Sequence, residues 1–152
     1  MQRRVLILAL PLAFAAGWLA SHGSVSAWAA DTRLTPQMID LAAMTEAEIG
    51  PLVPGIGTLR SRTLVADPEG SVAVQSGDVP RHTHTGSDEI QYVVSGSGSF
   101  WLGGSEQQVH PGDIIIIPRG TVHAGSHVAS GRLRVISIKL PPQAPGDFHL
   151  VP

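Results

Sequence analysis

Short apolar segments separated by turn-forming residues fill the sequence from residue 58 to residue 140. The segments are mostly rich in Val, Ile and Thr, which favour β-strands. They span residues 58–66, 71–76, 89–94, 99–102, 107–109, 113–117, 121–126 and 133–140. Turn signals stand between them, such as Asp67-Pro68-Glu69-Gly70, Gly96-Ser97-Gly98, Pro111-Gly112 and Ser130-Gly131. About eight short strands with such regular punctuation predict an all-β fold, either a sandwich or a barrel.

The composition supports one folded β domain. The chain has 152 residues, the length of a single domain. Its 17 glycines and 12 prolines accompany a hydrophobic content of 43%, which favours a turn-rich folded domain over a disordered chain. The four isoleucines at residues 114–117 predict a strand covered on both faces. We place the β-barrel at residues 58–140.

The first 29 residues have the layout of a secretory signal peptide. Arg3 and Arg4 precede an apolar run over residues 5–20, and Ala27-Trp28-Ala29 fits a cleavage site before Ala30. The residues around the arginine pair fit a twin-arginine signal poorly, so a Sec-type signal is preferred over a Tat signal. An uncleaved membrane anchor is the alternative, although the run is shorter than a bilayer span. We expect a periplasmic or secreted protein with no membrane association after cleavage.

The barrel is flanked by an N-terminal arm and a C-terminal tail. In the arm, residues 30–57, Thr35-Pro36 predicts the start of a helix of about three turns. Thr45 and Glu48 form a second candidate helix start, a capping box. In the tail, residues 141–152, the prolines of residues 141–145 cannot join a central strand. The tail is therefore expected to begin as an exposed arm.

Charge and cysteine content exclude several classes of function. The formal net charge is −2 and no cluster of Lys and Arg occurs, which argues against a nucleic-acid partner. Cysteine is absent. The chain therefore has no disulfide, zinc-thiolate site, iron–sulfur cluster or thiol nucleophile.

The histidines carry the chemical signal of the sequence. His82-Thr83-His84 places two imidazoles on one face of an extended segment, because side chains alternate along a strand. Neutral imidazoles are common ligands of transition metals. Glu89 opens the next strand and offers a carboxylate, and His123 follows the tight turn Pro118-Arg119-Gly120. These residues predict a metal site.

Two motifs in this region resemble those of the cupin superfamily. The first is His82-Thr83-His84, four residues, Glu89, six residues and Gly96. The second is Gly112, five residues, Pro118-Arg119-Gly120, two residues and His123. The fifteen residues between Gly96 and Gly112 match the short spacer of small bacterial cupins. The resemblance implies a cupin-type double-stranded β-helix, or jelly-roll barrel, with a short N-terminal helical segment.

The sequence departs from the cupin pattern at two positions. Four residues separate Gly77 from His82, where the family usually has five. His127 stands where the second motif usually has Asn. That position is not a metal ligand in the family, so the expected ligand set is unaffected.

The resemblance implies that His82, His84, Glu89 and His123 bind one divalent transition metal ion. Three imidazoles and a carboxylate suit Fe, Mn, Ni, Co or Zn. Four protein ligands leave two octahedral positions open to water, substrate or O₂. Asp88 is an alternative ligand, because a three-residue spacing after His84 would select it. A metal-free barrel is the alternative to the whole site.

Other polar and aromatic residues near the motifs have weaker claims. His127 and Gln91 are candidates for the layer behind the ligands, although for His127 an ordinary surface position is favoured. Arg119 could reach a bound ligand. His110 and His149 are expected to be solvated, and Asp113 to make a local turn hydrogen bond. Tyr92, Phe100 and Trp101 are expected to pack in the barrel wall.

The sequence therefore predicts an exported metal-binding cupin. The leading interpretation is a metal-dependent enzyme, of the dioxygenase or isomerase type, acting on a small polar molecule. The alternative is a non-enzymatic periplasmic protein that binds a metal or a small ligand. Terminal arms and an outer strand with no partner favour a homodimer. The sequence names neither the substrate nor the metal.

Overall fold

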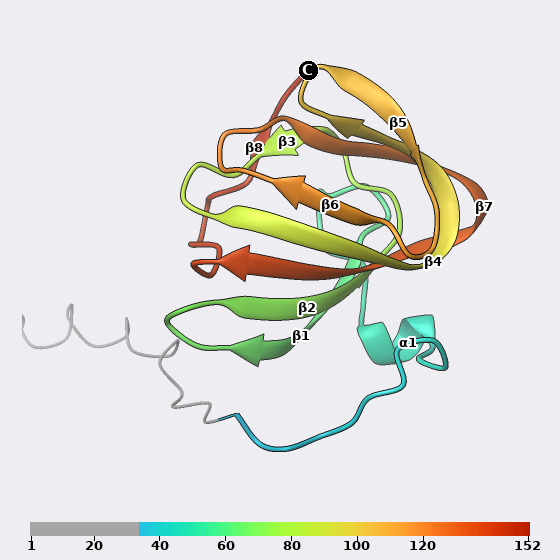
Figure 1. Cartoon of the computed structure of the whole chain (residues 1–152), viewed down its shortest axis with the longest axis vertical. Helices are drawn as coiled ribbons and strands as arrows, with labels where there is room; N and C mark the ends of the chain where they lie inside the picture. The colour runs from blue at the N-terminus through green and yellow to red at the C-terminus, as the bar shows by residue number, and fades with distance from the viewer. Residues whose placement is uncertain (1–33) are drawn as a thin grey trace, which may run out of the picture. The chain divides into compact units, whose positions relative to one another are not determined.

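The computed structural model describes residues 34–152, which consist mainly of β-strands. The elements are α1 (Glu46–Ile49), β1 (Arg60–Ala66), β2 (Ser71–Ser76), β3 (His82–Thr83), β4 (Asp88–Leu102), β5 (Ser105–Val109), β6 (Ile114–Ile117), β7 (His123–Leu140) and β8 (His149–Leu150). The strands form one antiparallel sheet (Figure 1). The all-β prediction is confirmed. The expected signal peptide lies outside the described residues.

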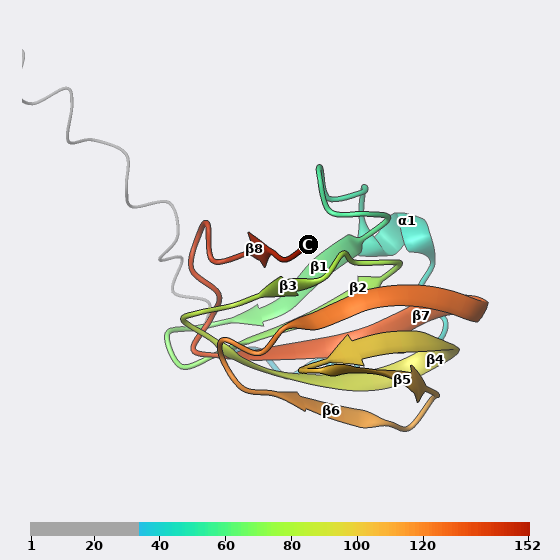
Figure 2. The same cartoon turned by 90° about the horizontal axis from the view of Figure 1, so that it is seen from above.

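Strands β4 and β7 are the long strands around which the sheet is built. β4 pairs with β6 through its first half and with β5 through its second half. β7 pairs with β4 along most of its length, with β2 through its second half and with β3 at its first residue. Because each long strand has different neighbours at its two ends, the sheet curls. Figure 2 shows β6 on one side of the curl and β3 and β8 on the other.

Two of the expected turns lie inside the long strands. β4 runs through residues 96–98 and β7 runs through residues 130–131. The pairing of the two strands shifts in register around Gly96 and Gly98, as it does at β-bulges. Gly96 has a φ of +77°, and a Cβ there would lie 2.2 Å from the carbonyl oxygen of Arg132. Glycine thus lets the two strands approach closely within the sheet and does not end a strand there.

Side-chain alternation on β4 and β7 separates the inside of the barrel from the outside. Successive inward-facing cross-strand pairs are Val93–Val135, Gln91–Ser137 and Glu89–Lys139. The interior therefore changes from apolar to polar to charged toward one end of the barrel. The apolar part holds the core cluster, which contains Val93, Phe100, Val109, Ile115, Ile117, Ala124, Leu133 and Val135.

Strand β6 is covered on one face only. Ile115 and Ile117 are buried, whereas Ile114 and Ile116 are 63% and 58% exposed. The expectation that the isoleucine run is covered on both faces is therefore wrong. β6 pairs with β4 alone, and among the described residues no element shields its outer side chains. The run has a buried face and an exposed apolar face.

The N-terminal arm holds a helix of one turn. Thr45 and Glu48 form the expected capping box at the start of α1, so that prediction is confirmed. The helix expected from Thr35-Pro36 is wrong, because residues 34–40 have no regular structure. Met38 is fully exposed, and a short helix with no surface to pack against is marginal in water.

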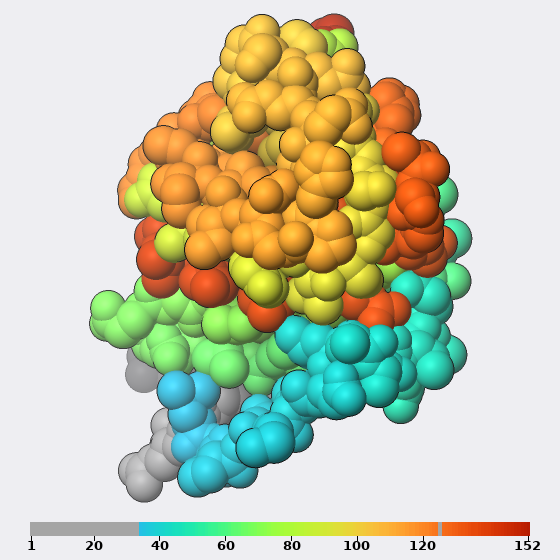
Figure 3. All heavy atoms as spheres, turned by 45° about the vertical axis from the view of Figure 1, so that its right-hand side comes forward, coloured from blue at the N-terminus to red at the C-terminus, as the bar shows by residue number. Residues whose placement is uncertain are grey.

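Glu46 ties this arm to the sheet. Its carboxylate accepts hydrogen bonds from the Ser76 hydroxyl at 2.8 Å and from Arg134 at 3.1 Å. Arg132 lies 2.9 Å away. Burial opposes the charge, but the Ser76 and Arg134 contacts lower the pKa of Glu46. Figure 3 shows the arm, in blue to cyan, next to the green strands β1 and β2.

The C-terminal tail turns back across the barrel. Pro141 and residues 144–146 are exposed, as expected of an arm. Asp147 is buried, however, and β8 pairs with β3. The end of the chain is thereby brought beside His82 and His84. In the part of the chain from residue 34 onward, no helix is long and apolar enough to cross a membrane.

Candidate metal centre

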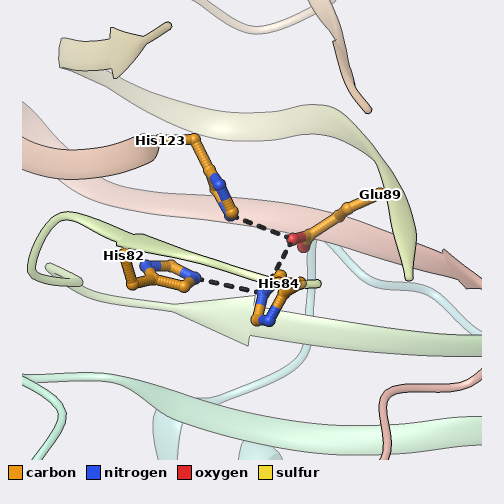
Figure 4. A group of neighbouring side chains, drawn as sticks. All are labelled: His82, His84, Glu89 and His123. Carbon is orange, nitrogen blue, oxygen red and sulfur yellow. Dashed lines mark hydrogen bonds and ion pairs between the residues drawn. The ribbon is translucent and has the colours of Figure 1, made fainter. Parts of the chain in front are cut away.

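Four buried side chains converge at the polar end of the barrel (Figure 4). His82 and His84 come from β3 and the residue after it, Glu89 from β4 and His123 from the start of β7. His82 and His123 are directly paired across the sheet. Each residue offers one potential ligand atom, and these four atoms all lie within 4.8 Å of one another. All four residues are at most 4% exposed.

Each of the three imidazoles is oriented by a backbone carbonyl. Nδ1 of His82 lies 2.9 Å from the Pro80 oxygen, and Nδ1 of His123 lies 2.9 Å from the Thr121 oxygen. Nδ1 of His84 lies 2.5 Å from the Asp147 oxygen. A carbonyl only accepts, so we assign the ring proton to Nδ1 in all three. The three Nε2 lone pairs then face one another.

The two carboxylate oxygens of Glu89 have different surroundings. Oε1 accepts hydrogen bonds from Ser137 at 2.6 Å and from Gln91 at 2.9 Å. Oε2 faces Nε2 of His123 at 3.2 Å and Nε2 of His84 at 3.4 Å. One oxygen thus fixes the side chain and the other is directed at the imidazoles.

Glu89 and His82 have the charge states that a metal site needs. Burial opposes the charge of Glu89, but its pKa lies well below the ordinary value, and in the assigned tautomers the Lys139 charge and the Ser137 hydrogen bond are the contacts that favour the ionised form. Burial, reinforced by His123, lowers the pKa of His82 to about 3. Near neutral pH the site therefore offers an ionised carboxylate and a neutral imidazole, which are the forms that bind metal ions.

The donor set fits a divalent transition metal. Glu89 Oε2 and His123 Nε2 are buried and have no hydrogen-bond partner. Nε2 of His82 lies only 3.1 Å from Nε2 of His84, although both atoms carry lone pairs in the assigned tautomer. A cation relieves such crowding of electron pairs. The Lys139 Nζ does so at His84 Nε2, 2.8 Å away, and a divalent ion could do so for the whole group. Bound there, a divalent ion would act as a Lewis acid with positions open to a small molecule.

The second sequence motif supports the first through its turn. The backbone N–H of Gly120 donates to the carbonyl oxygen of His84 at 2.6 Å, and Thr121 N–H closes the turn on Pro118 at 3.0 Å. Gly120 has a φ of +79°, which favours glycine. Gly112 also has a positive φ, +98°. The motif residues thus build turns, one of which holds the His84 segment in place.

Lys139 brings a positive charge into the site. Its Nζ lies 2.8 Å from Nε2 of His84 and 3.7 Å from Oε2 of Glu89, and it donates to Gln143. The residue is 8% exposed. Burial lowers the pKa of Lys139, and the nearby Glu89 carboxylate opposes that shift.

A cavity of about 210 Å³ adjoins the candidate ligands His82 and Glu89. His82, Glu89 and Lys139 contribute to its wall, together with uncharged polar and apolar side chains. Among the latter are Gln75, Gln91, Ser126, Gln143 and Phe148. Val53 and Ile56 of the N-terminal arm also line it. The cavity is smaller than the roughly 300–1,000 Å³ of a drug-sized ligand site, so it suits a molecule of few atoms.

The structure separates the two candidates for the layer behind the ligands. Gln91 lies there, because its amide holds Glu89 in place. His127 does not, because its side chain is exposed. A strict alternation from His123 would turn both histidines inward. Ala124 has a φ of +70°. It pairs with Trp101 and His127 pairs with Ser99, so β7 advances three residues where β4 advances two. This bulge reverses the alternation and turns His127 outward.

Asp88 and Arg119 lie outside the site. The Arg119 guanidinium and backbone N–H bind the Asp88 carboxylate, with a shortest distance of 2.6 Å. The Arg119 contacts lower the pKa of Asp88 to about 2. Asp88 faces away from Glu89 because neighbouring strand residues point to opposite faces. Asp88 as the alternative ligand is therefore wrong, and Arg119 is engaged away from the cavity.

The remaining candidates fall into two groups. His110 and His149 are at least half exposed, as expected, and the Asp113 carboxylate accepts the His110 backbone N–H at 2.7 Å. Phe100 packs in the core, and Trp101 lies under Arg81 at 5.0 Å. Tyr92 faces outward and is 41% exposed, so its expected packing in the barrel wall is wrong.

Sequence reasoning missed four residues of the site: Ser137, Lys139, Asp147 and Phe148. The Phe148 ring stacks on His82 with ring centroids 4.0 Å apart. The Asp147 carboxylate accepts the backbone N–H groups of Thr85 and Gly86. Polar residues at every second position of an apolar strand were a signal for Ser137 and Lys139. No comparable signal marked the tail residues.

Comparison with known proteins finds a cupin domain in the chain. Residues 70–139 match the family model described as a cupin domain. A germin-like protein of Ipomoea nil is 35% identical over 86 residues, which cover 52% of this chain and 36% of that protein. An uncharacterized protein of Methanocaldococcus jannaschii is 30% identical over 70 residues, covering 46% of this chain and 56% of that protein. The matches thus span about half or less of these relatives.

Solved structures show the same fold. A Klebsiella pneumoniae protein with a double-stranded β-helix domain has a TM-score of 0.57 and 20% identity, covering 72% of this chain and 96% of that one. A Thermus thermophilus protein has a TM-score of 0.53 and 16% identity, covering 65% of this chain and 96% of that one. The fold is a cupin-type double-stranded β-helix. Together with the domain match, it supports placing the chain in the cupin superfamily.

Proposed function

We propose that this chain is an exported metal-binding cupin that acts as a metal-dependent enzyme, of the dioxygenase or isomerase type, on a small polar molecule. The observation that carries the proposal is that one nitrogen of each of three imidazoles and one oxygen of Glu89 lie within 4.8 Å of one another. The arrangement lies beside a cavity of about 210 Å³, which has room for a molecule of few atoms. Both features suit a bound metal with a neighbouring substrate.

The polar groups around the ligands fix the geometry of the site. Ser137 and Gln91 hold Glu89, and three backbone carbonyls orient the imidazoles. Such contacts raise the basicity of the ligands and fix the histidine tautomers. The Phe148 ring stacks on His82. A small molecule in the cavity would therefore meet a preformed site.

The direct test is the metal content of the purified protein and its variants. Wild type should hold one divalent ion per chain. His84→Ala and His123→Ala should each release most of it, because each removes one of four ligands. His127→Ala is the matched control, since His127 lies on the same strand as His123 but faces outward. Equal metal content in wild type and a His84→Ala, His123→Ala double variant would contradict the site.

A non-enzymatic binding protein is the second candidate. It is favoured by the amide and hydroxyl groups of Gln75, Gln91, Gln143 and Ser126 in the cavity wall. These groups bind and orient a ligand but do not exchange protons near neutral pH. Metal that stays bound, together with a retained but unchanged ligand in native mass spectrometry, would favour this candidate over the enzyme.

Export and self-association are parts of the proposal that rest on different evidence. The Arg3-Arg4 pair, the apolar run and Ala27-Trp28-Ala29 support export, and N-terminal sequencing of the periplasmic form should begin near Ala30. A homodimer is supported by exposed apolar side chains on the adjacent strands β4 and β6, namely Tyr92, Ile114 and Ile116. A second copy of the chain packed on this apolar patch would cover them.

A further inference from the structure

We propose that Lys139 and the adjoining cavity bind the carboxylate of a small organic acid whose remaining atoms are uncharged. The inference rests on the proposed metal site and names the class of molecule held beside it. Lys139 Nζ lies beside two of the four ligand atoms, at 2.8 Å from His84 Nε2 and 3.7 Å from Glu89 Oε2. It also belongs to the cavity wall.

Charge balance calls for an anion at this point. Without a metal, the Glu89 carboxylate compensates the Lys139 ammonium. With a divalent ion bound, Glu89 would neutralise part of the ion's charge, and the three histidines are neutral in the assigned tautomer. The ammonium, only 8% exposed, would then face a net positive centre. Two like charges in a buried site are costly unless an anion lies between them.

No nearby acidic side chain is free to supply that anion. The Asp147 carboxylate accepts hydrogen bonds from Thr85 N–H at 2.7 Å, Thr85 hydroxyl at 2.8 Å and Gly86 N–H at 3.0 Å. It is thereby held on the loop after His84. The Gln143 side chain accepts a hydrogen bond from Lys139 and donates one to the backbone carbonyl oxygen of Asp147 at 2.9 Å. It therefore orients the lysine without neutralising its charge. Asp147 offsets part of the Lys139 charge through space, but among the described residues Glu89 is the carboxylate in contact with the ammonium. An anionic ligand would supply the remaining counter-charge.

The rest of the cavity limits which other groups a carboxylate ligand can have. Among the described residues that line it, Glu89 and Lys139 are the charged ones. A second carboxylate on the ligand would find no second ammonium or guanidinium there. The other walls are apolar or amide-bearing, with Phe148, Phe100 and Gln75 among them. A monocarboxylate with an apolar or hydroxylated body fits this lining.

The test compares butyrate with its uncharged analogue butyramide on Co(II)-loaded protein. Calorimetry gives the dissociation constant, and the visible spectrum of Co(II) reports whether the ligand reaches the metal. Wild type should bind butyrate more tightly than butyramide and show a spectral change with butyrate. Lys139→Met should weaken butyrate binding roughly 10- to 100-fold, as expected for loss of a charged hydrogen bond. Lys139→Arg should retain a measurable preference for butyrate.

Arg119→Met is the matched control. It removes one positive charge of the barrel rim that is paired with Asp88 outside the cavity, and it should leave butyrate affinity within about twofold. Metal-loaded wild type that binds butyramide as tightly as butyrate would overturn the ligand class while leaving the metal site intact. That comparison needs no variant, so it decides the matter even if Lys139→Met does not fold. Wild type that holds no divalent ion would overturn the proposed function and this inference with it.

Discussion

Gly96→Ala should be among the most damaging single-methyl additions to this barrel. The added Cβ would lie 2.2 Å from the Arg132 carbonyl oxygen and 2.5 Å from its carbon, both backbone atoms of β7. A left-handed conformation costs a non-glycine residue about 1–2 kcal/mol. Forcing extra atoms into a packed region costs about 1–3 kcal/mol more. The free energy of unfolding should therefore fall by about 2–5 kcal/mol.

Two other glycines separate these contributions. Gly103 has a φ of +61° with nothing within 4 Å of an added Cβ, so Gly103→Ala should cost only about 1–2 kcal/mol. Gly98 has no positive φ, but its Cβ would lie 2.3 Å from the His127 carbonyl oxygen. Gly98→Ala should cost about 1–3 kcal/mol from the contact alone.

Urea unfolding of the three variants, followed by fluorescence, measures these differences. Gly96→Ala should unfold at the lowest urea concentration, and its loss should approximate the sum of the other two. Metal content should fall in the same variant, because β4 and β7 carry Glu89 and His123 on either side of the crossing. If Gly96→Ala is no less stable than Gly103→Ala, the close approach of the two strands is not what requires glycine.

Three further predictions concern the arm, the tail and the outer face. Because the pKa of Glu46 is lowered in the folded state, its stabilising contribution should be present above pH 4.5 and lost as pH falls toward the folded pKa; Glu46→Gln should flatten that part of the stability curve. Asp147→Ala should weaken metal binding about tenfold or more in a chelator competition, because Asp147 positions the carbonyl that orients His84. Wild type should have a dimer mass in light scattering at micromolar concentration, and Ile116→Lys should be a monomer; a wild-type monomer would refute the dimer.

The strand pattern was predictable where chain-local rules decide the structure. Residues 71–76 form a strand with the expected limits, because turn residues bound an apolar segment on both sides. The capping box at Thr45 is also local, since its two hydrogen bonds lie within four residues. Gly96 and Gly131 were expected to lie in turns between strands, but both lie inside long strands. A glycine with positive φ occurs both in turns and in bulges. Only the neighbouring strand decides between the two.

The ligand set could be anticipated, but its surroundings could not. His82, His84, Glu89 and His123 lie in two short motifs whose spacing is visible in the sequence. Lys139 and Asp147 reach the site from 55 and 63 residues beyond His84, so their contacts depend on the closed sheet. The direction of the His127 side chain also could not be predicted from the sequence. Its direction depends on one bulge at Ala124, and alternation counted from His123 gives the opposite face.

Strand register links the stability of the barrel to the integrity of the site. On β4, the inward residues Glu89, Gln91 and Val93 alternate with the outward residues Asp88, Ile90 and Tyr92. A slip of one residue would turn Tyr92 toward the core and replace Glu89 by Asp88 among the imidazoles. The Val93–Val135 pair and the Glu89–Lys139 pair stand in the same ladder, so the apolar core selects the register that the site requires. A substitution that loosens the β4–β7 crossing should therefore reduce both metal binding and stability. A substitution of His84 should reduce metal binding alone, when the stabilities of variant and wild type are compared without metal.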